Sequence, residues 1–282
     1  MANSFVTPLR YPGGKGRLGA WLSEIIHSNG LSAGTYAEPY AGGAGAAMYL
    51  LIHGHIDKVE INDVDPVIYA FWWSVINDTE RFVDLILRTP VTIDEWKKQK
   101  KILLREDIED KTSLGFAAFF LNRTNRSGII RGGVIGGQNQ AGNYKLDARY
   151  NPEGLVTRVM NIAERKQSIK ISNLDALDFV ERLATRNDVL IYLDPPYYKK
   201  GGQLYRNSYT HSDHVKVADV VKNIRSPWIV TYDNCCEITS IYDWANSFEF
   251  SLYYSTHIKR PVGKEVCFYD NIRIEKDLYL KR

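Results

Sequence analysis

Hydrophobic and polar positions along the chain follow two periodicities, which together predict an α/β protein. Short runs rich in β-branched and aromatic residues indicate strands, and apolar residues three and four positions apart indicate helices. Because helical segments separate most of the strands, we expect a mostly parallel sheet. The predicted strands cover residues 35–40, 57–63, 168–173, 189–194, 227–233, 248–256 and 265–272.

The segments between the strands carry recognisable end signals. Asp65 and Pro66 are typical of a helix cap followed by a first-turn proline. Ser212 precedes another helical pattern. Residues 257–264, HIKRPVGK, lie between the last two predicted strands, and their proline and glycine predict a hairpin turn. This hairpin can add an antiparallel strand to the sheet.

A long interruption separates the second and third predicted strands. It spans about a hundred residues, far more than an ordinary crossover between parallel strands requires. Its first part is mainly helical in pattern, and its later part is basic and rich in glycine. We therefore expect an inserted subdomain over residues 72–165, and a main domain formed by residues 1–71 and 166–282.

Composition is typical of a folded soluble protein. Of the 282 residues, 44% are hydrophobic and 24% are charged, which argues against disorder. No run approaches the roughly 18 apolar residues of a membrane helix, and the first residues lack an apolar signal core. The three cysteines are too few and too clustered for a disulfide framework, and no spacing of cysteine and histidine resembles a zinc site. We expect a cytoplasmic protein with no membrane association and no metal. The net charge of +3 is compatible with nucleic acid without requiring it.

Two candidate binding features follow the first two predicted strands, at the edge where open α/β sheets bind ligands. AEPYAGGAG, residues 37–45, has glycines that allow a ligand to approach the backbone closely, although it lacks the spacing of the dinucleotide fingerprint. About 20 residues further on, Asp63 ends the second strand, and an acid there suits a pair of ribose hydroxyls. Together the turn and the acid favour an adenosine-containing cofactor.

IYLDPPYYKK, residues 191–200, is the third feature. Asp194 ends the fourth strand, and Pro195 and Pro196 remove two backbone donors while leaving their carbonyls as acceptors. A carboxylate and a carbonyl can accept both hydrogens of an exocyclic amino group, and Tyr197 offers an aromatic face on which the base can stack. A strand ended by prolines would explain where the run stops, but not why an acid and tyrosines surround it.

A phosphate-binding loop is a competing interpretation of residues 10–17, RYPGGKGR. That motif requires glycine at position 9 and serine or threonine at position 16, whereas this chain has Leu9 and Gly16. No strand-like run precedes the stretch. We therefore set a nucleotide triphosphatase aside.

The motifs in their order resemble one known family. PGGK near the N-terminus, EPYAGGAG, IND, an insertion and then DPPY are similar to the Dam-type (D12 class) adenine-specific DNA methyltransferases. The resemblance covers nearly the whole chain. It implies an S-adenosylmethionine-dependent, Rossmann-like seven-stranded sheet whose last strand is antiparallel, with an inserted, mainly helical DNA-recognition subdomain. It also implies a site-specific enzyme that methylates N6 of a flipped-out adenine in double-stranded DNA.

The same resemblance implies roles for particular residues. The catalytic pocket would consist of Asp194, Pro195, Pro196 and Tyr197. The cofactor would contact Tyr11, Lys15, Glu38, Pro39, Tyr40, Gly42, Asp63, Asp175 and Asp194. Two departures are visible: Tyr11 stands where the family often has tryptophan, and AGGAG is one residue longer than the commoner F-x-G-x-G, so the matching of its glycines is open.

DNA contacts are expected from two basic stretches. From residue 122 to residue 150, five Lys and Arg residues and six glycines stand with one acid, a composition that suits phosphates and groove edges. Nonspecific phosphate contact and plain solvation are the alternatives. The expected DNA-binding residues are Asn122, Arg123, Asn125, Arg126 and Arg131, followed after the catalytic motif by Lys199, Lys200 and Arg206.

Several alternatives stay open at the level of the sequence. Serine or asparagine before PPY often accompanies cytosine N4 or a protein glutamine as acceptor; Asp194 favours adenine, and RNA stays open as the nucleic acid. A noncatalytic DNA-binding protein of the same fold is a rival from a different class, although the intact motifs speak against it. We expect a monomer, and a separate restriction endonuclease is an open partner.

Overall fold

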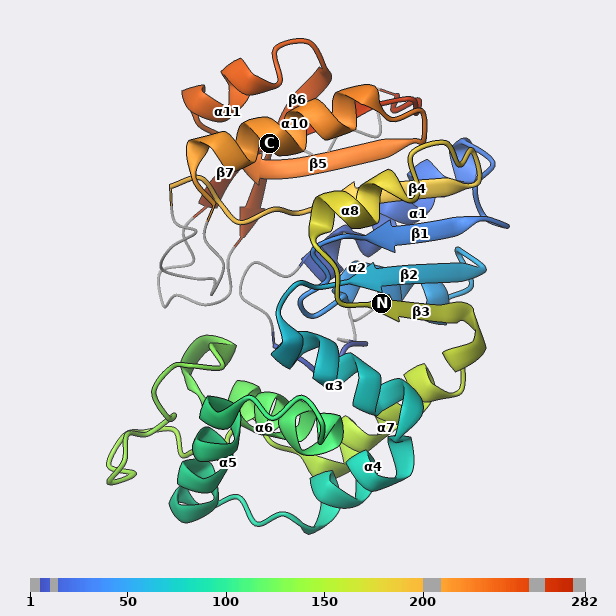
Figure 1. Ribbon diagram of the computed structural model, residues 1–282. Helices are drawn as coiled ribbons and strands as arrows, with labels where there is room; N and C mark the ends of the chain where they lie inside the picture. Colours follow the sequence, from blue (N-terminus) through green and yellow to red (C-terminus); the bar gives the residue numbers. More distant parts are fainter. Residues whose placement is uncertain (1–5, 11–14, 200–208, 254–261, 276–282) are drawn as a thin grey trace.

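A seven-stranded sheet forms the centre of the molecule (Figure 1). The structure, a computed structural model, describes residues 6–10, 15–199, 209–253 and 262–275. Every predicted strand is present, with ends that differ by a few residues from the expected ones. The strands are β1 (Thr35–Glu38), β2 (Lys58–Asn62), β3 (Ile169–Ser172), β4 (Val189–Leu193), β5 (Trp228–Asp233), β6 (Asn246–Tyr253) and β7 (Val262–Asp270).

The strand order is β3-β2-β1-β4-β5-β7-β6. Strands β1 to β5 run parallel to one another, and β7 is antiparallel to both β5 and β6. The predicted antiparallel hairpin is therefore confirmed, with β7 placed between β5 and β6. Most of the expected turn at residues 257–264 lies outside the described residues.

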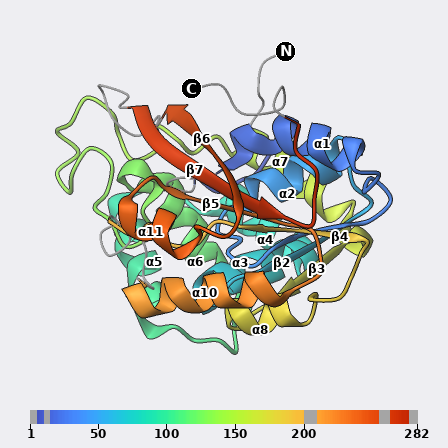
Figure 2. The same cartoon turned by 90° about the horizontal axis from the view of Figure 1, so that it is seen from above.

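Helices cover both faces of the sheet (Figure 2). Helices α1 (Gly19–Ser28) and α2 (Gly45–Ile52) cover one face, and α8 (Ala176–Glu181), α10 (His211–Asn223) and α11 (Cys236–Ile241) cover the other. Successive strand residues point to opposite faces, so Tyr36 and Tyr192 pack in the first core while Ala37 and Leu193 pack in the second. Short 3-10 helices are η1 (Lys15–Leu18), η2 (Arg126–Gly128) and η3 (Lys166–Ser168).

The insertion between β2 and β3 is mainly helical, as expected. Its helices are α3 (Pro66–Asn77), α4 (Thr79–Arg88), α5 (Ile93–Arg105), α6 (Lys111–Thr124) and α7 (Pro152–Ala163). They lie together beneath the sheet in Figure 1, and the long connection from α6 to α7 projects toward the side to which the parallel strands point. The proposed boundary at residue 72 falls inside the continuous helix α3, so the division into a main domain and an inserted subdomain stays a prediction.

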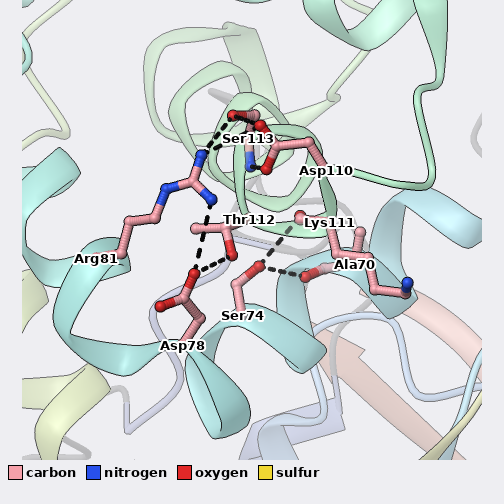
Figure 3. A network of polar contacts seen from close by, with 8 residues as sticks. All are labelled: Ala70, Ser74, Asp78, Arg81, Asp110, Lys111, Thr112 and Ser113. Atoms are coloured by element: carbon pink, nitrogen blue, oxygen red, sulfur yellow. Dashed lines mark hydrogen bonds and ion pairs between the residues drawn. The ribbon is translucent and has the colours of Figure 1, made fainter.

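Polar contacts join α3, α4 and the start of α6 (Figure 3). Asp110 caps α6 by accepting a hydrogen bond from the N–H of Ser113 at 3.1 Å, and Arg81 reaches the same carboxylate at 3.1 Å. Thr112 donates to Asp78 at 2.6 Å. A cap of this type contributes about 0.5–2 kcal/mol, whereas exposed ion pairs contribute less. These contacts fix the start of α6 against the two earlier helices.

The helix end signals were largely right. Asp65 caps α3 by accepting from the N–H of Val67 at 3.0 Å, with Pro66 in the first turn. The expectation for Ser212 was wrong by two residues, because α10 begins at His211 with Thr210 as its cap. Asp213 explains the shift: its carboxylate accepts from both the N–H and the hydroxyl of Thr210, at 3.0 and 2.7 Å.

Candidate active site

Glu38 links the first strand to the helix that follows it. It ends β1, and its carboxylate accepts a hydrogen bond from the N–H of Ala47, in the first turn of α2, at 3.0 Å. Only 5% of the residue is exposed. Burial raises the pKa of Glu38 to about 8, and nearby Asp194 adds to the rise. The interaction with Tyr36 and the hydrogen bond from Ala47 offset only part of the desolvation cost.

The glycine-rich turn between Glu38 and α2 is held from two sides. Gly42 and Ala44 have positive φ angles of 45° and 42°, and glycine is the residue best suited to that conformation. The N–H of Gly42 donates to Asp63 at 2.9 Å, and the carbonyl of Gly42 accepts from the indole N–H of Trp72 at 2.9 Å. The turn therefore lies between the end of β2 and helix α3.

Asp63 directly follows β2 and is half-buried. One carboxylate oxygen accepts from Gly42 and the other accepts from the N–H of Asp65 at 2.9 Å. Burial raises the pKa of Asp63 to about 7 despite these two bonds. Each carboxylate oxygen can accept more than one hydrogen bond, so the group retains capacity for a hydroxyl ligand.

Asn62 joins three segments at this edge of the sheet, a role that the sequence did not reveal. Its side chain is buried, and its amide donates to the carbonyls of Pro39 and Leu174, each at 3.1 Å. Its oxygen accepts from the N–H of Leu174 and from the hydroxyl of Ser172, each at 2.9 Å. Because these partners lie just after β1 and at or just after the end of β3, far from Asn62 in sequence, no local sequence signal could have found them.

Asp194 lies at the end of β4, next to the end of β1. The hydroxyl of Thr231, on β5, donates to its carboxylate at 3.2 Å and also lies 2.7 Å from the hydroxyl of Tyr192. Asp194 is half-buried, and it is close enough to Glu38 to raise the pKa of that carboxyl group. The side chain therefore sits at the carboxyl edge beside the glycine-rich turn, and not in the apolar interior.

The residues after Asp194 are held by β5 and β7. Pro195 is buried and Pro196 is half-buried. The hydroxyl of Tyr197 donates to the fully buried carboxyl group of Glu265, on β7, at 2.7 Å. Asp233, the last residue of β5, accepts from the backbone N–H groups of residues 198 and 199 at 2.9 and 3.2 Å.

Tyr197 itself is less accessible than the sequence led us to expect. Only 6% of the residue is exposed, so its ring is packed inside the protein. Stacking on a base therefore requires that the surroundings of the ring open. Glu265 and Asp233 carried no signal in the sequence beyond their place near strand ends. Asp233 reaches the motif because β5 pairs with β4, and Glu265 reaches it because β7 pairs with β5.

The other expected cofactor residues lie along the same edge. Pro39 is buried, and Tyr40 is half-buried with its hydroxyl 3.1 Å from that of Tyr209. Asp175 is exposed and caps α8 through the N–H of Leu177 at 2.8 Å. Burial raises the pKa of Tyr40, and Asp175 lies near enough to add to the effect. Tyr11 and the side chain of Lys15 lie outside the described residues.

Among the expected DNA-binding residues, Asn122 and Asn125 are fully buried. The side chain of Asn122 accepts from the N–H of Arg10 at 2.7 Å and donates to the carbonyls of Arg10 and Gly128, at 2.8 and 2.7 Å. That of Asn125 accepts from the indole N–H of Trp96 at 2.7 Å. Both amides are engaged in holding loops, so in this conformation they do not face a ligand, contrary to the expectation of base contacts.

Arg123 is also inaccessible, at 8% exposure, and its guanidinium donates to backbone carbonyls. Arg126 and Lys199 are exposed. Arg131 is exposed and lies 2.5 Å from the carboxylate of Glu106. Lys200 and Arg206 lie outside the described residues. The accessible part of the expected set is therefore Arg126, Arg131 and Lys199.

Among residues 6–10, 15–199, 209–253 and 262–275, no group of three or more His, Cys, Asp or Glu side chains is arranged to hold a metal ion. Within the same ranges, no helix combines the length and the apolar character needed to span a membrane.

The sheet order, with β7 antiparallel beside β5, and the acidic residues at the ends of β1, β2 and β4 define the class: this is the fold of class I S-adenosylmethionine-dependent methyltransferases. The model of one family matches residues 11–259: the D12 class N6 adenine-specific DNA methyltransferases. The chain belongs to this family, which confirms the resemblance seen in its motifs.

Solved structures of low sequence identity are also similar to the chain. A putative class I S-adenosylmethionine-dependent methyltransferase from Listeria monocytogenes matches at 8% identity and a TM-score of 0.42, over 94% of this chain. The chain spans 62% of the length of that protein. An rRNA methyltransferase from Streptomyces viridochromogenes matches at 12% identity and a TM-score of 0.40, over 92% of this chain and 85% of its own. A search of curated proteins gave no match.

Proposed function

We propose that this protein transfers a methyl group from S-adenosylmethionine to the N6 amino group of an adenine flipped out of duplex DNA. The observation that carries the proposal is the position of Asp194. Asp194 directly follows β4, which pairs with β1, and it lies near enough to Glu38 to raise the pKa of that carboxyl group, so an acceptor for an amino group is available at the edge that carries the glycine-rich turn of the expected cofactor site. Membership of the D12 class supports adenine in DNA as the substrate.

The acidic character of the site supports a cationic cofactor. Glu38 and Asp63 have raised pKa values because both are buried, and within the described part of the chain neither has a lysine or arginine at ion-pair distance. S-adenosylmethionine carries a sulfonium and an ammonium group, so its binding would offset this cost. Glu38, Tyr40, Gly42 and Asp63 would hold it, together with Pro39, Asp175 and the expected Tyr11 and Lys15. The cofactor supplies an activated methyl group.

Asp194 and Pro195 would orient the accepting nitrogen. The lone pair of an aromatic amino group is delocalised into the ring, which makes the nitrogen a poor nucleophile. Hydrogen bonds from its two hydrogens to the Asp194 carboxylate and the Pro195 carbonyl favour a pyramidal nitrogen and direct its lone pair. Thr231 restrains Asp194 by donating to it at 3.2 Å, so the contribution of the protein is mainly alignment.

Base flipping follows from the position of this nitrogen, which a duplex keeps within the base stack. Once its ring becomes accessible, Tyr197 would stack on the extruded adenine and return about 1–3 kcal/mol of the unstacking cost. Arg126 and Lys199 are exposed and would contact DNA, with Arg131 joining them if its pair with Glu106 opens. Lys200 and Arg206 remain expected contacts that follow the catalytic motif.

Replacement of Asp194 tests the proposal. We expect Asp194→Ala to lower the rate of methyl transfer to DNA by at least about 100-fold, because it removes a group that acts in the transition state. Binding of S-adenosylmethionine, measured by calorimetry, should persist. Asp219→Ala, which removes an exposed carboxylate on α10, is the matched control and should leave the rate unchanged.

Product analysis separates the alternatives. Mass spectrometry of nucleosides after reaction should show N6-methyladenine in DNA, with no N4-methylcytosine and no transfer to RNA. Near-normal transfer by Asp194→Ala would reject the catalytic role of that carboxylate. Failure of the wild-type chain to bind S-adenosylmethionine would favour a noncatalytic DNA-binding protein.

A further inference from the structure

Two arginines of the helical insertion, the buried Arg123 and the half-buried Arg158, hold the N-terminal segment of residues 6–10. Arg123, on α6, donates from Nε to the carbonyl of Arg149 at 2.8 Å and from a terminal nitrogen to the carbonyl of Pro8 at 3.4 Å. Arg158, on α7, donates to the carbonyl of Thr7 at 3.4 Å. The guanidinium groups of two helices therefore meet at one stretch of backbone, close to Arg149.

Arg10 brings a further guanidinium to the same place. The backbone N–H of Arg10 donates to the side-chain oxygen of Asn122 at 2.7 Å, and its carbonyl accepts from the side-chain nitrogen of Asn122 at 2.8 Å. Gly128 lies so close that a Cβ there would stand 2.1 Å from the carbonyl oxygen of Arg10, so the segment cannot shift toward the insertion. In the described part of the chain, the Nη1 atom of Arg10 is buried and makes no hydrogen bond.

These arginines form a group of like charges, which we call the arginine cluster: Arg10, Arg123, Arg149 and Arg158. Burial, together with the other three members of the cluster, lowers the pKa of Arg123 to about 9. Burial also lowers the pKa of Arg10, with Arg149 contributing. Among the described residues, every arginine that forms an ion pair with a carboxylate lies outside the cluster. No carboxylate there neutralises the cluster.

Such an arrangement is unfavourable without an anion. A buried guanidinium N–H that makes no hydrogen bond carries a desolvation cost, and neighbouring like charges repel one another. A tetrahedral anion with several oxygens can accept from more than one guanidinium at once, and Arg matches phosphate in geometry. Arg149 is exposed, so the cluster opens from the buried Arg123 toward solvent.

The position of the cluster identifies the source of the anion. Thr7, whose carbonyl accepts from Arg158, donates from its hydroxyl to the carbonyl of Gly43 at 2.6 Å, so the segment that the cluster holds adjoins the glycine-rich turn at the carboxyl edge of the sheet. We propose that Arg10, Arg149 and Arg158, with Arg123 beneath them, bind a backbone phosphate of the DNA. This inference rests on the proposed function, and it gives the insertion a phosphate site distinct from the exposed residues Arg126 and Arg131, while Arg123 takes a supporting position in it.

Salt-dependent DNA binding tests the site. We expect Arg149→Gln and Arg158→Gln each to weaken binding of a labelled duplex, measured by fluorescence anisotropy, equally for all DNA sequences. Loss of one phosphate contact should lower the slope of log affinity against log salt concentration by about 1. The ratio of wild-type affinity to variant affinity should therefore fall about 3–4-fold between 50 and 200 mM salt. Arg158→Lys, which keeps the charge, should restore most of the slope.

Two further variants sharpen the comparison. Arg225→Gln removes an exposed arginine just before β5, at the opposite end of that strand from the site, and should leave affinity and slope unchanged. Arg126→Gln is expected to alter the preference among sequences, in contrast to the uniform loss at the cluster. Thermal unfolding of each variant checks the fold, and the exposed side chain of Arg149 makes its replacement the safer one.

Two results would overturn the proposal. The first is unchanged affinity and slope in both Arg149→Gln and Arg158→Gln, which would leave the cluster as a support for residues 6–10 alone. The second is weaker binding of S-adenosylmethionine with unchanged binding of DNA, which would assign the anion to the carboxylate of the cofactor. Either result leaves methylation by the wild-type chain intact, so failure here is distinguishable from failure of the proposed function.

Discussion

Asn62 is the residue whose replacement should reveal how the carboxyl edge of the sheet is held together. Asn62→Ala removes four hydrogen bonds, which join it to Pro39, Ser172 and Leu174. At a net contribution of about 0.5–1.5 kcal/mol for each bond, the free energy of unfolding should fall by about 2–6 kcal/mol. Two of the bonds go to Leu174, so they are not independent and the lower half of that range is expected.

Asn62→Asp tests the two donated hydrogen bonds separately from the size of the side chain. The carboxylate keeps the size and the acceptors but loses both donors, and it faces the carbonyl oxygens of Pro39 and Leu174. We therefore expect this variant to be at least as destabilised as Asn62→Ala. Asn77→Ala is the matched control, because Asn77 is exposed and makes one bond to a backbone carbonyl.

Urea denaturation measures these changes, and calorimetry with S-adenosylmethionine measures their effect on the cofactor site. Because Asn62 connects the segments that carry Pro39 and Leu174, affinity for the cofactor should fall in both variants at a temperature where they remain folded. A change in unfolding free energy below about 0.5 kcal/mol for Asn62→Ala, within the range of ordinary surface substitutions, would refute this account.

Two other predictions concern the catalytic motif and pH. Tyr197→Phe and Glu265→Gln should each lower the free energy of unfolding by about 1–3 kcal/mol, because each weakens a buried hydrogen bond. The loss in the double variant should be smaller than the sum of the two single losses. Fully additive losses in denaturation would show that the two residues are uncoupled. The pKa of Glu38 is raised to about 8 in the folded protein, whereas in the unfolded chain this carboxyl releases its proton near pH 4. Between these values the folded state holds one more proton than the unfolded state. The contribution of Glu38 therefore makes the free energy of unfolding fall as pH rises from about 4 to 8. Glu38→Gln should flatten that dependence in denaturation at pH 5 to 8, and an unchanged slope would contradict the assignment.

Local patterns were sufficient to predict most of the fold. Strand β4 is a continuous apolar run and β5 is rich in β-branched and aromatic residues. Asp65 with Pro66 marks a helix start by chemistry that involves only adjacent residues. The candidate site was expected by the same logic, because parallel strands bring their carboxyl ends to one edge. Glu38 and Asp194 are neighbours for that reason alone.

Contacts between distant segments could not be predicted in this way. Asn122 lies in a polar, basic stretch that is typical of a nucleic-acid contact, yet its partner is the backbone of Arg10, 112 residues away in sequence. Arg123 is buried by the same segment. An asparagine or arginine has the same local sequence whether it faces DNA or holds a distant loop, so only the packing of residues 6–10 distinguishes the two.

The pairing of β5 with β7 has a consequence for the order in which the protein matures. The DPPY motif is complete once Tyr197 has been added to the growing chain, but Glu265, which accepts the hydrogen bond from its hydroxyl, is added later, on the strand that pairs with β5. A nascent chain lacking β7 therefore has the complete motif without one of the strands that hold it. Catalytic competence should appear only after the final hairpin has been translated and has joined the sheet.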